Sequence, residues 1–174
     1  MKNCRILLTS ILPTILAVYS AQASPAAGQS LSREKALSGL KSCSRSLSAE
    51  GCNEDAAETL IGFYKSGDRA LLKPLLDAGL VSDGALSESL GSFYAEVLHH
   101  QPRVFLSSLA SRPKKAQHHL ARLAGAMDGS GMPKEMLREV KFKLRKLAAQ
   151  KRSELSAVAR LCLSEIEKAN RSQR

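Results

Sequence analysis

The side chains best suited to chemistry in this sequence are basic ones near its C-terminal end. Five of them recur at spacings of four, three, four and seven residues: Lys134, Arg138, Lys141, Arg145 and Arg152. Because an α-helix turns by about 100° per residue, this spacing places them on one face, within about 40° of each other. Leucine and valine occupy the adjacent face at positions 137, 140, 144 and 147. The pattern predicts an amphipathic helix whose five cations, the basic stripe, bind an acidic protein or another polyanion.

The charge of the chain supports this interpretation. The 174 residues carry a net charge of +10. Residues 24–100 hold 7 basic and 10 acidic side chains, whereas residues 101–174 hold 17 basic and 6 acidic ones. Such asymmetry concerns the partner rather than the fold. The alternative is a solvated helix exterior, on which Glu135 and Glu139 pair with basic residues three and four positions away.

Two classes of polyanion fit the sequence less well than the others. Phe142 is the one aromatic residue among the basic ones, and a single stacking platform is weak support for nucleic-acid binding. A basic amphipathic helix also suits an anionic membrane surface. However, the apolar side of this helix is needed to cover a small core, which favours burial in the protein.

Paired histidines suggest a second chemistry, a metal site. The four histidines form two adjacent pairs, at positions 99–100 and 118–119. Neighbours on a helix point about 100° apart, so neither pair can chelate alone. His100 and His119 would meet if their two helices packed antiparallel, with Glu96 as a third ligand. The sequence contains neither HExxH nor CxxC spacing. Helix-end histidines that cap carbonyls or face water are therefore the simpler interpretation.

Other catalytic patterns are missing, and three cysteines need an explanation. The sequence has no G-x-S-x-G motif and no phosphate-binding glycine loop, so we expect no cofactor and favour a protein that is not an enzyme.

Cys43 and Cys52 are expected to form a disulfide that closes a loop of about 10 residues. Cys162 stands among leucines and is expected to be a buried thiol. A bond from Cys162 to Cys43 or Cys52, or to another chain, is the alternative.

The N-terminal segment predicts export. Lys2 and Arg5 precede an apolar stretch at 6–19, and Ala21 and Ala23 provide the small residues that signal peptidase requires. We therefore expect a cleavable signal peptide at 1–23, a flexible leader at 24–30, one domain at 31–170 and a disordered tail at 171–174. The expected location is periplasmic or extracellular, with no transmembrane helix after cleavage.

Helices must position these residues, because apolar side chains recur at three- and four-residue steps and no segment alternates with period two. The central element is a helical hairpin at 83–109, broken at Pro102, with an apolar face that predicts the core. Around it we expect helices at about 30–42, 54–66, 69–79 and 114–127. A last helical region covers 133–170, with a bend near 150–153. The sequence thus predicts an all-α, single-domain fold of six or seven helices.

An internal repeat accompanies the hairpin. A single shift of the chain against itself aligns apolar positions of two units within 54–111, including Leu60 with Tyr94, Leu72 with Leu106 and Leu75 with Leu109. Each unit has a longer and then a shorter helix, which resembles the α-hairpins of HEAT or TPR arrays. Leu90-Gly91-x-x-Tyr94 is similar to part of the TPR consensus. A plain helical bundle is the alternative.

Three functions follow from these features. The first is an exported, non-enzymatic binding or adaptor protein whose basic stripe contacts an acidic partner. The second is a metal-dependent hydrolase or metal carrier that uses the paired histidines. The third is a structural partner subunit of an envelope complex, linked through Cys162.

Overall fold

The structure is a computed structural model that describes residues 31–43, 54–150 and 153–172. These residues form eight α-helices and one short 3-10 helix and contain no strand, which confirms the predicted all-α class. The predicted signal peptide and leader, Cys52, the side chain of Cys43 and Arg152 lie outside the described residues. The disulfide and the export signal therefore remain predictions. Within the described part of the chain, no helix is both long enough and apolar enough to cross a bilayer.

The chain breaks where its turn-forming residues are. The elements are α1 (Arg33–Cys43), α2 (Glu54–Lys65), η1 (Arg69–Leu71), α3 (Leu72–Gly79), α4 (Gly84–His100), α5 (Pro102–Ala110), α6 (Lys114–Ala126), α7 (Lys134–Ala148) and α8 (Glu154–Arg171). Gly67 adopts φ of +118° just after α2, a conformation that L side chains rarely take. Pro74 lies in the first turn of α3, where its missing N–H removes no intrahelical bond. It therefore follows a restart of the helix at η1 and does not kink a longer one.

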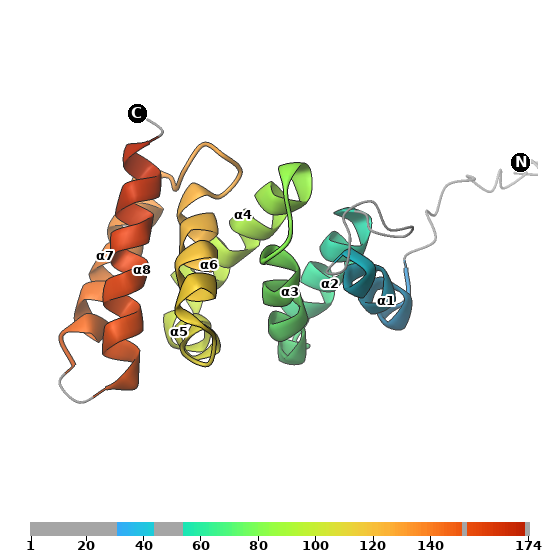
Figure 1. The fold of residues 1–174 in the computed structure, drawn as a ribbon, viewed down its shortest axis with the longest axis horizontal. Coiled ribbons are helices and arrows are strands. Elements are labelled where there is room, and N and C mark those ends of the chain that lie inside the picture. The colour runs from blue at the N-terminus through green and yellow to red at the C-terminus, as the bar shows by residue number, and fades with distance from the viewer. Residues whose placement is uncertain (1–30, 44–53, 151–152, 173–174) are drawn as a thin grey trace, which may run out of the picture.

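The helices form an elongated row, with α1 to α3 at one end and the α7–α8 pair at the other (Figure 1). Helix α4 runs obliquely between the ends and packs against both α2 and α6. Helix α6 in turn packs along α8. The arrangement is consistent with a helical bundle.

The predicted hairpin of α4 and α5 does form the centre of the core. Tyr94 and Phe105 are fully buried, with ring centroids 6.2 Å apart, and Phe93 packs edge-on against Tyr64 of α2 at 5.1 Å. The hydroxyl of Tyr94 donates to the carbonyl of Leu75 in α3 at 2.6 Å. Its burial raises the pKa of this phenol far above the usual value. These aromatic side chains link α2 with α4 and α5.

The last helical region is divided in two, which makes the predicted count of helices too low. Helix α7 ends at Ala148, and α8 begins at Glu154 after Ser153 in extended conformation. The break falls where the sequence predicted a bend. Its consequence is that α8 folds back along α7 and faces it with the acidic side chain of Glu167. Arg171, assigned by the sequence to a disordered tail, still belongs to α8.

Candidate anion-binding face and pocket

Helix α7 packs against the core with its apolar side and exposes its other side to solvent. Val140 and Leu144 are fully buried, and Leu147 is nearly so. The exposed side chains that form the opposite side, here called the α7 face, are Lys134, Glu135, Arg138, Glu139, Phe142, Arg145 and Lys146. The predicted amphipathic helix is thus present, with cations on its outer side.

The structure divides the basic stripe into paired and unpaired cations. The ammonium of Lys141 is partly buried and lies 2.8 Å from the carboxylate of Glu167 in α8. Arg145 reaches the same carboxylate at 3.7 Å. The hydrogen bond from Lys141, more than the charge of Arg145, lowers the pKa of Glu167. Lys134 and Arg138, in contrast, have no carboxylate partner within the described residues.

Phe142 stands on the α7 face as its one aromatic residue. Its side chain is 68% exposed, more than any other large apolar side chain in the described part of the chain. Helical spacing puts Arg138 one turn before it and Arg145 and Lys146 one turn after it. Packing among the described residues leaves most of this residue exposed. An exposed aromatic residue with arginine neighbours is typical of binding surfaces, where both types are enriched.

A polar contact fixes α7 to the end of α4. Glu139 lies 2.8 Å from Nε2 of His99 and 3.6 Å from Lys143, four residues further on. Lys143 also donates to the backbone carbonyl of His99 at 2.8 Å. The hydrogen bond with His99 lowers the pKa of Glu139. The local pairing predicted for Glu139 is therefore confirmed, but the link to His99 is one that sequence spacing did not reveal.

The three candidate metal ligands do not meet. His119 directs Nε2 at the carbonyl of Gly79 in α3, 2.9 Å away, instead of at α4. Glu96 pairs with Lys65 of α2 at 2.7 Å. His100 makes no hydrogen bond or ion pair with either of them and lines the pocket described below. Among the described residues, no group of three or more histidine, cysteine, aspartate or glutamate side chains could hold a metal ion. The packing of α6 therefore removes the basis of the metal-site hypothesis.

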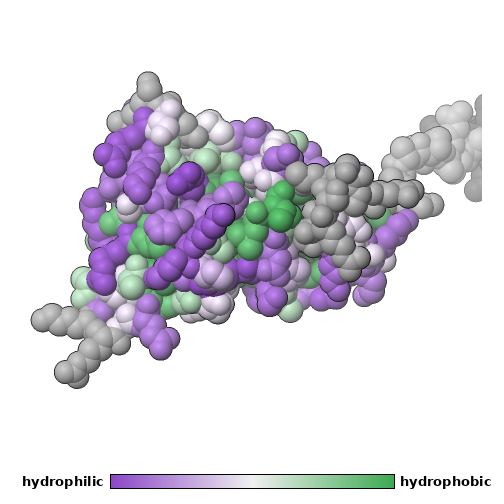
Figure 2. All heavy atoms as spheres, viewed as in Figure 1, coloured by the Kyte–Doolittle hydropathy of each residue, from purple (hydrophilic) through white to green (hydrophobic). Residues whose placement is uncertain are grey.

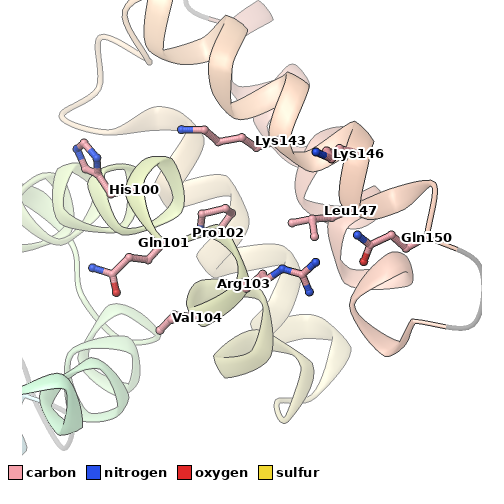
Figure 3. Close-up of a pocket in the computed structure, with 9 residues that line it drawn as sticks. All are labelled: His100, Gln101, Pro102, Arg103, Val104, Lys143, Lys146, Leu147 and Gln150. Atoms are coloured by element: carbon pink, nitrogen blue, oxygen red, sulfur yellow. The ribbon is translucent and has the colours of Figure 1, made fainter.

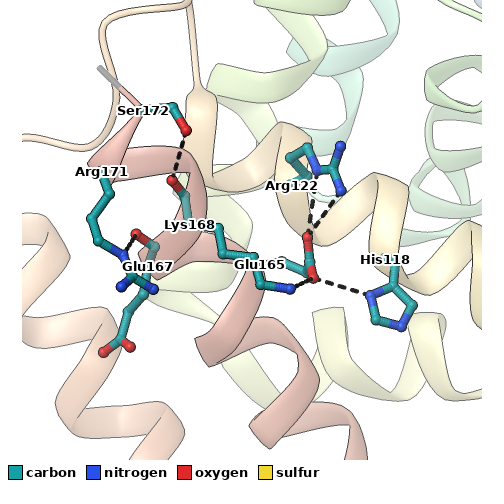
Figure 4. A network of polar contacts seen from close by, with 7 residues as sticks. All are labelled: His118, Arg122, Glu165, Glu167, Lys168, Arg171 and Ser172. Atoms are coloured by element: carbon teal, nitrogen blue, oxygen red, sulfur yellow. Dashed lines mark hydrogen bonds and ion pairs between the residues drawn. The ribbon is translucent and has the colours of Figure 1, made fainter. Parts of the chain in front are cut away.

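A buried carboxylate joins α6 to α8, as Figure 4 shows, and sequence reasoning missed it. The side chain of Glu165 is 2% exposed and contacts Lys168 at 2.8 Å, His118 at 3.1 Å and Arg122 at 3.3 Å. Burial favours the neutral acid, but these three partners prevail and lower the pKa of Glu165. The surface over α6 and α8 is accordingly hydrophilic (Figure 2). Because one acid binds Arg122, Lys168 and His118, this part of the basic surface is structural.

A pocket of about 420 Å³ opens between the α4–α5 junction and α7 (Figure 3). Three apolar side chains line it, Pro102, Val104 and Leu147. Its remaining lining consists of cationic, histidine and glutamine side chains, and no acidic residue is among them. No local pattern in the sequence indicates this pocket, because its two walls come from segments that are distant in the chain, at 100–104 and 143–150.

Comparison with models of known protein families, with curated proteins and with solved structures found no significant match to this chain.

Proposed function

We propose that this protein is a non-enzymatic binding module that presents the α7 face to an acidic protein. The observation that carries the proposal is the combination of unpaired cations with an exposed Phe142. Neither Lys134 nor Arg138 forms an ion pair with a carboxylate of the described residues, although Glu135 is exposed beside them on the same face. Unpaired cations steer an acidic partner to the surface, and an aromatic anchor contributes affinity once contact is made.

The scaffold that we propose for this face is a short array of α-hairpins. The units α2–α3 and α4–α5 both place a longer helix before a shorter one. Residues that the internal repeat aligns, such as Leu60 with Tyr94 and Leu75 with Leu109, are buried in both units. Phe63 and Val97, which the same shift of the chain aligns, depart from this, since Phe63 is 38% exposed and Val97 is buried. Arrays of this kind serve as extended binding surfaces.

An acidic protein is preferred over the other polyanions. Base stacking on single-stranded nucleic acid uses successive aromatic residues, and the α7 face has only Phe142. The apolar residues of α7 that a membrane surface would require, Val140, Leu144 and Leu147, are already buried in the core. A protein partner can combine acidic side chains with an apolar cleft for the ring.

The test is binding of an acidic peptide, poly-glutamate, measured by fluorescence anisotropy at about 50 and 200 mM salt. Lys134→Glu with Arg138→Glu should abolish the salt-dependent binding, whereas Lys114→Glu with Lys115→Glu, which changes the net charge equally on α6, should leave most of it. Phe142→Ala should weaken a natural partner's binding without changing its salt dependence. Equal loss in both double variants, or no binding at the lower salt, would refute the α7 face as a site.

The cations chosen for this test differ from those that the sequence alone would suggest. Lys141 and Arg145 lie centrally in the basic stripe, but both contact Glu167. Replacing them with glutamate would put like charges against that carboxylate and loosen α7 from α8. A loss of binding in such a variant would not separate the site from the fold, whereas Lys134 and Arg138 avoid this ambiguity.

The third function, a subunit linked through a thiol, receives no support from the position of Cys162. Its side chain is fully buried and free, as the sequence predicted. Burial raises the pKa of the thiol to about 12, so the reactive thiolate is scarce at neutral pH. A bond to another chain would require α8 to open. The binding experiment above also tests assembly with a partner that needs no covalent bond.

A further inference from the structure

The pocket between the α4–α5 junction and α7 has a composition that selects a particular class of ligand. Pro102, Val104 and Leu147 give it apolar walls, and Val104 is 42% exposed although it is a large aliphatic residue. Arg103 extends from α5 toward Leu147 and Gln150 on the α7 side (Figure 3). A volume of about 420 Å³ lies within the range of small-molecule sites, which combine apolar walls with a few polar groups.

Of the basic side chains that line the pocket, one already has partners among the described residues and two do not. Lys143 is occupied, because it donates to the carbonyl of His99 and lies near Glu139. Arg103 and Lys146 are exposed and make no ion pair with any carboxylate of the described residues. The pocket begins at the first turn of α5, where the first backbone amides of a helix have no intrahelical acceptor. The dipole of α5 adds positive potential there.

We infer that this pocket binds a small carboxylate that carries an apolar body. Arg103 and Lys146 would hold the carboxylate from opposite sides, and Gln150 can donate to it from the end of α7. The apolar body would lie against Pro102, Val104 and Leu147. A neutral ligand would leave the cations uncompensated, and a highly charged phosphate compound would leave the apolar wall unfilled. The site shares Lys146 with the proposed α7 face, but Arg103 and Val104 belong to α5 and lie outside that face.

The experiment uses isothermal titration calorimetry of the purified protein with octanoate, octanol, octylamine, benzoate and inorganic phosphate. Octanoate should bind, octanol should bind more weakly and octylamine should not bind. Comparison of octanoate with benzoate decides between an aliphatic and an aromatic body. Octanol binding as tight as octanoate, phosphate binding tighter than both carboxylates, or no binding of either carboxylate would overturn the inference.

Variants locate the site. Arg103→Met with Lys146→Met removes both charges but retains the apolar stems, so octanoate affinity should fall roughly tenfold per cation while octanol affinity stays unchanged. Lys134→Met with Arg138→Met is the matched control on the α7 face and should leave octanoate binding unchanged. All four side chains are exposed, so circular dichroism should report intact folds. Unchanged octanoate affinity in the pocket variant would refute the assignment. Because the control variant weakens poly-glutamate binding instead, failure of the pocket and failure of the proposed function are distinguishable.

Discussion

Replacement of Glu165 by glutamine tests how α6 and α8 are held together. Glutamine keeps the shape of the side chain and one acceptor oxygen but removes the negative charge. That charge is compensated by Lys168 and Arg122, and His118 contacts the same carboxylate. The side chains of Lys168, Arg122 and His118 are 57%, 66% and 50% exposed, whereas the Glu165 side chain is 2% exposed. The variant therefore separates the contribution of the charge from that of packing.

The expected cost lies between two limits. Removing one member of a fully buried ion pair costs about 3–5 kcal/mol, whereas an exposed pair contributes about 0.2–1 kcal/mol. Here the acid is buried but water screens the outer ends of its partners, and glutamine still accepts a hydrogen bond. We expect the free energy of unfolding to fall by about 2 kcal/mol, between these limits. For a protein of this length, this corresponds to a decrease of roughly 4–8 °C in Tm.

The pH dependence supplies the stricter test. The pKa of Glu165 is lowered in the folded protein, so its ionised form is more favourable there than in the unfolded chain. This stabilisation is fully present above the unfolded pKa and is lost as pH falls through the folded pKa. Urea unfolding followed by circular dichroism should show the full difference between wild type and Glu165→Gln at pH 7. The difference should then shrink as the solution becomes more acidic than the usual glutamate pKa.

Other carboxylates, including Glu139 and Glu167, titrate in both proteins, so their contributions largely cancel in this difference. Equal stability of the two proteins at pH 7 would refute the reasoning. A difference that persists unchanged in acid would also refute it, because the cost would then come from packing and not from charge.

Three further outcomes follow from the packing. Gly91→Ala should destabilise the protein by about 1–3 kcal/mol in urea unfolding, because the new Cβ would clash with the carbonyl oxygen of Met127. The control Gly62→Ala has open space around it and should be neutral or stabilising by up to about 1 kcal/mol. Cys162 should react with a thiol reagent only at the rate of unfolding, and fast labelling of folded protein would contradict its burial. Tyr94→Phe should cost about 0.5–1.5 kcal/mol by removing the buried hydrogen bond to the carbonyl of Leu75, and an unchanged midpoint in urea would contradict this.

The sequence was sufficient to predict most of the helices, because the local signals are strong. Apolar residues three and four apart identified the buried sides of α4 and α7, and Pro102 identified the boundary between α4 and α5. The division of the last region into α7 and α8 was harder to predict. Residues 150–153 contain neither glycine nor proline, so only the sequence around Ser153 indicated a break. Without that break, the side of α7 that faces α8 could not be identified.

The candidate site could be predicted only in part, because ion pairing between helices depends on packing. Helical spacing placed Lys141 and Arg145 with the other cations, but their shared partner Glu167 lies on the next helix, α8. The same limitation hid Glu165, whose partners on α6 are distant from it in the chain. The pocket also depends on the approach of α5 to α7. Local patterns thus predict which residues share a helix face but not which of them are neutralised across an interface.

This distinction decides how the excess positive charge should be interpreted. Cations around Glu165 and Glu167 have a structural task, and their number says little about a partner. Among the cations that form no ion pair within the described residues, two groups lie beside apolar side chains. One holds Lys134 and Arg138 beside an exposed Phe142, and the other holds Lys146 opposite Arg103 over an apolar wall. Folding alone explains neither the exposed ring nor the unpaired cations. The two places differ in shape, an open face and a pocket, and for this reason we assign them ligands of different size.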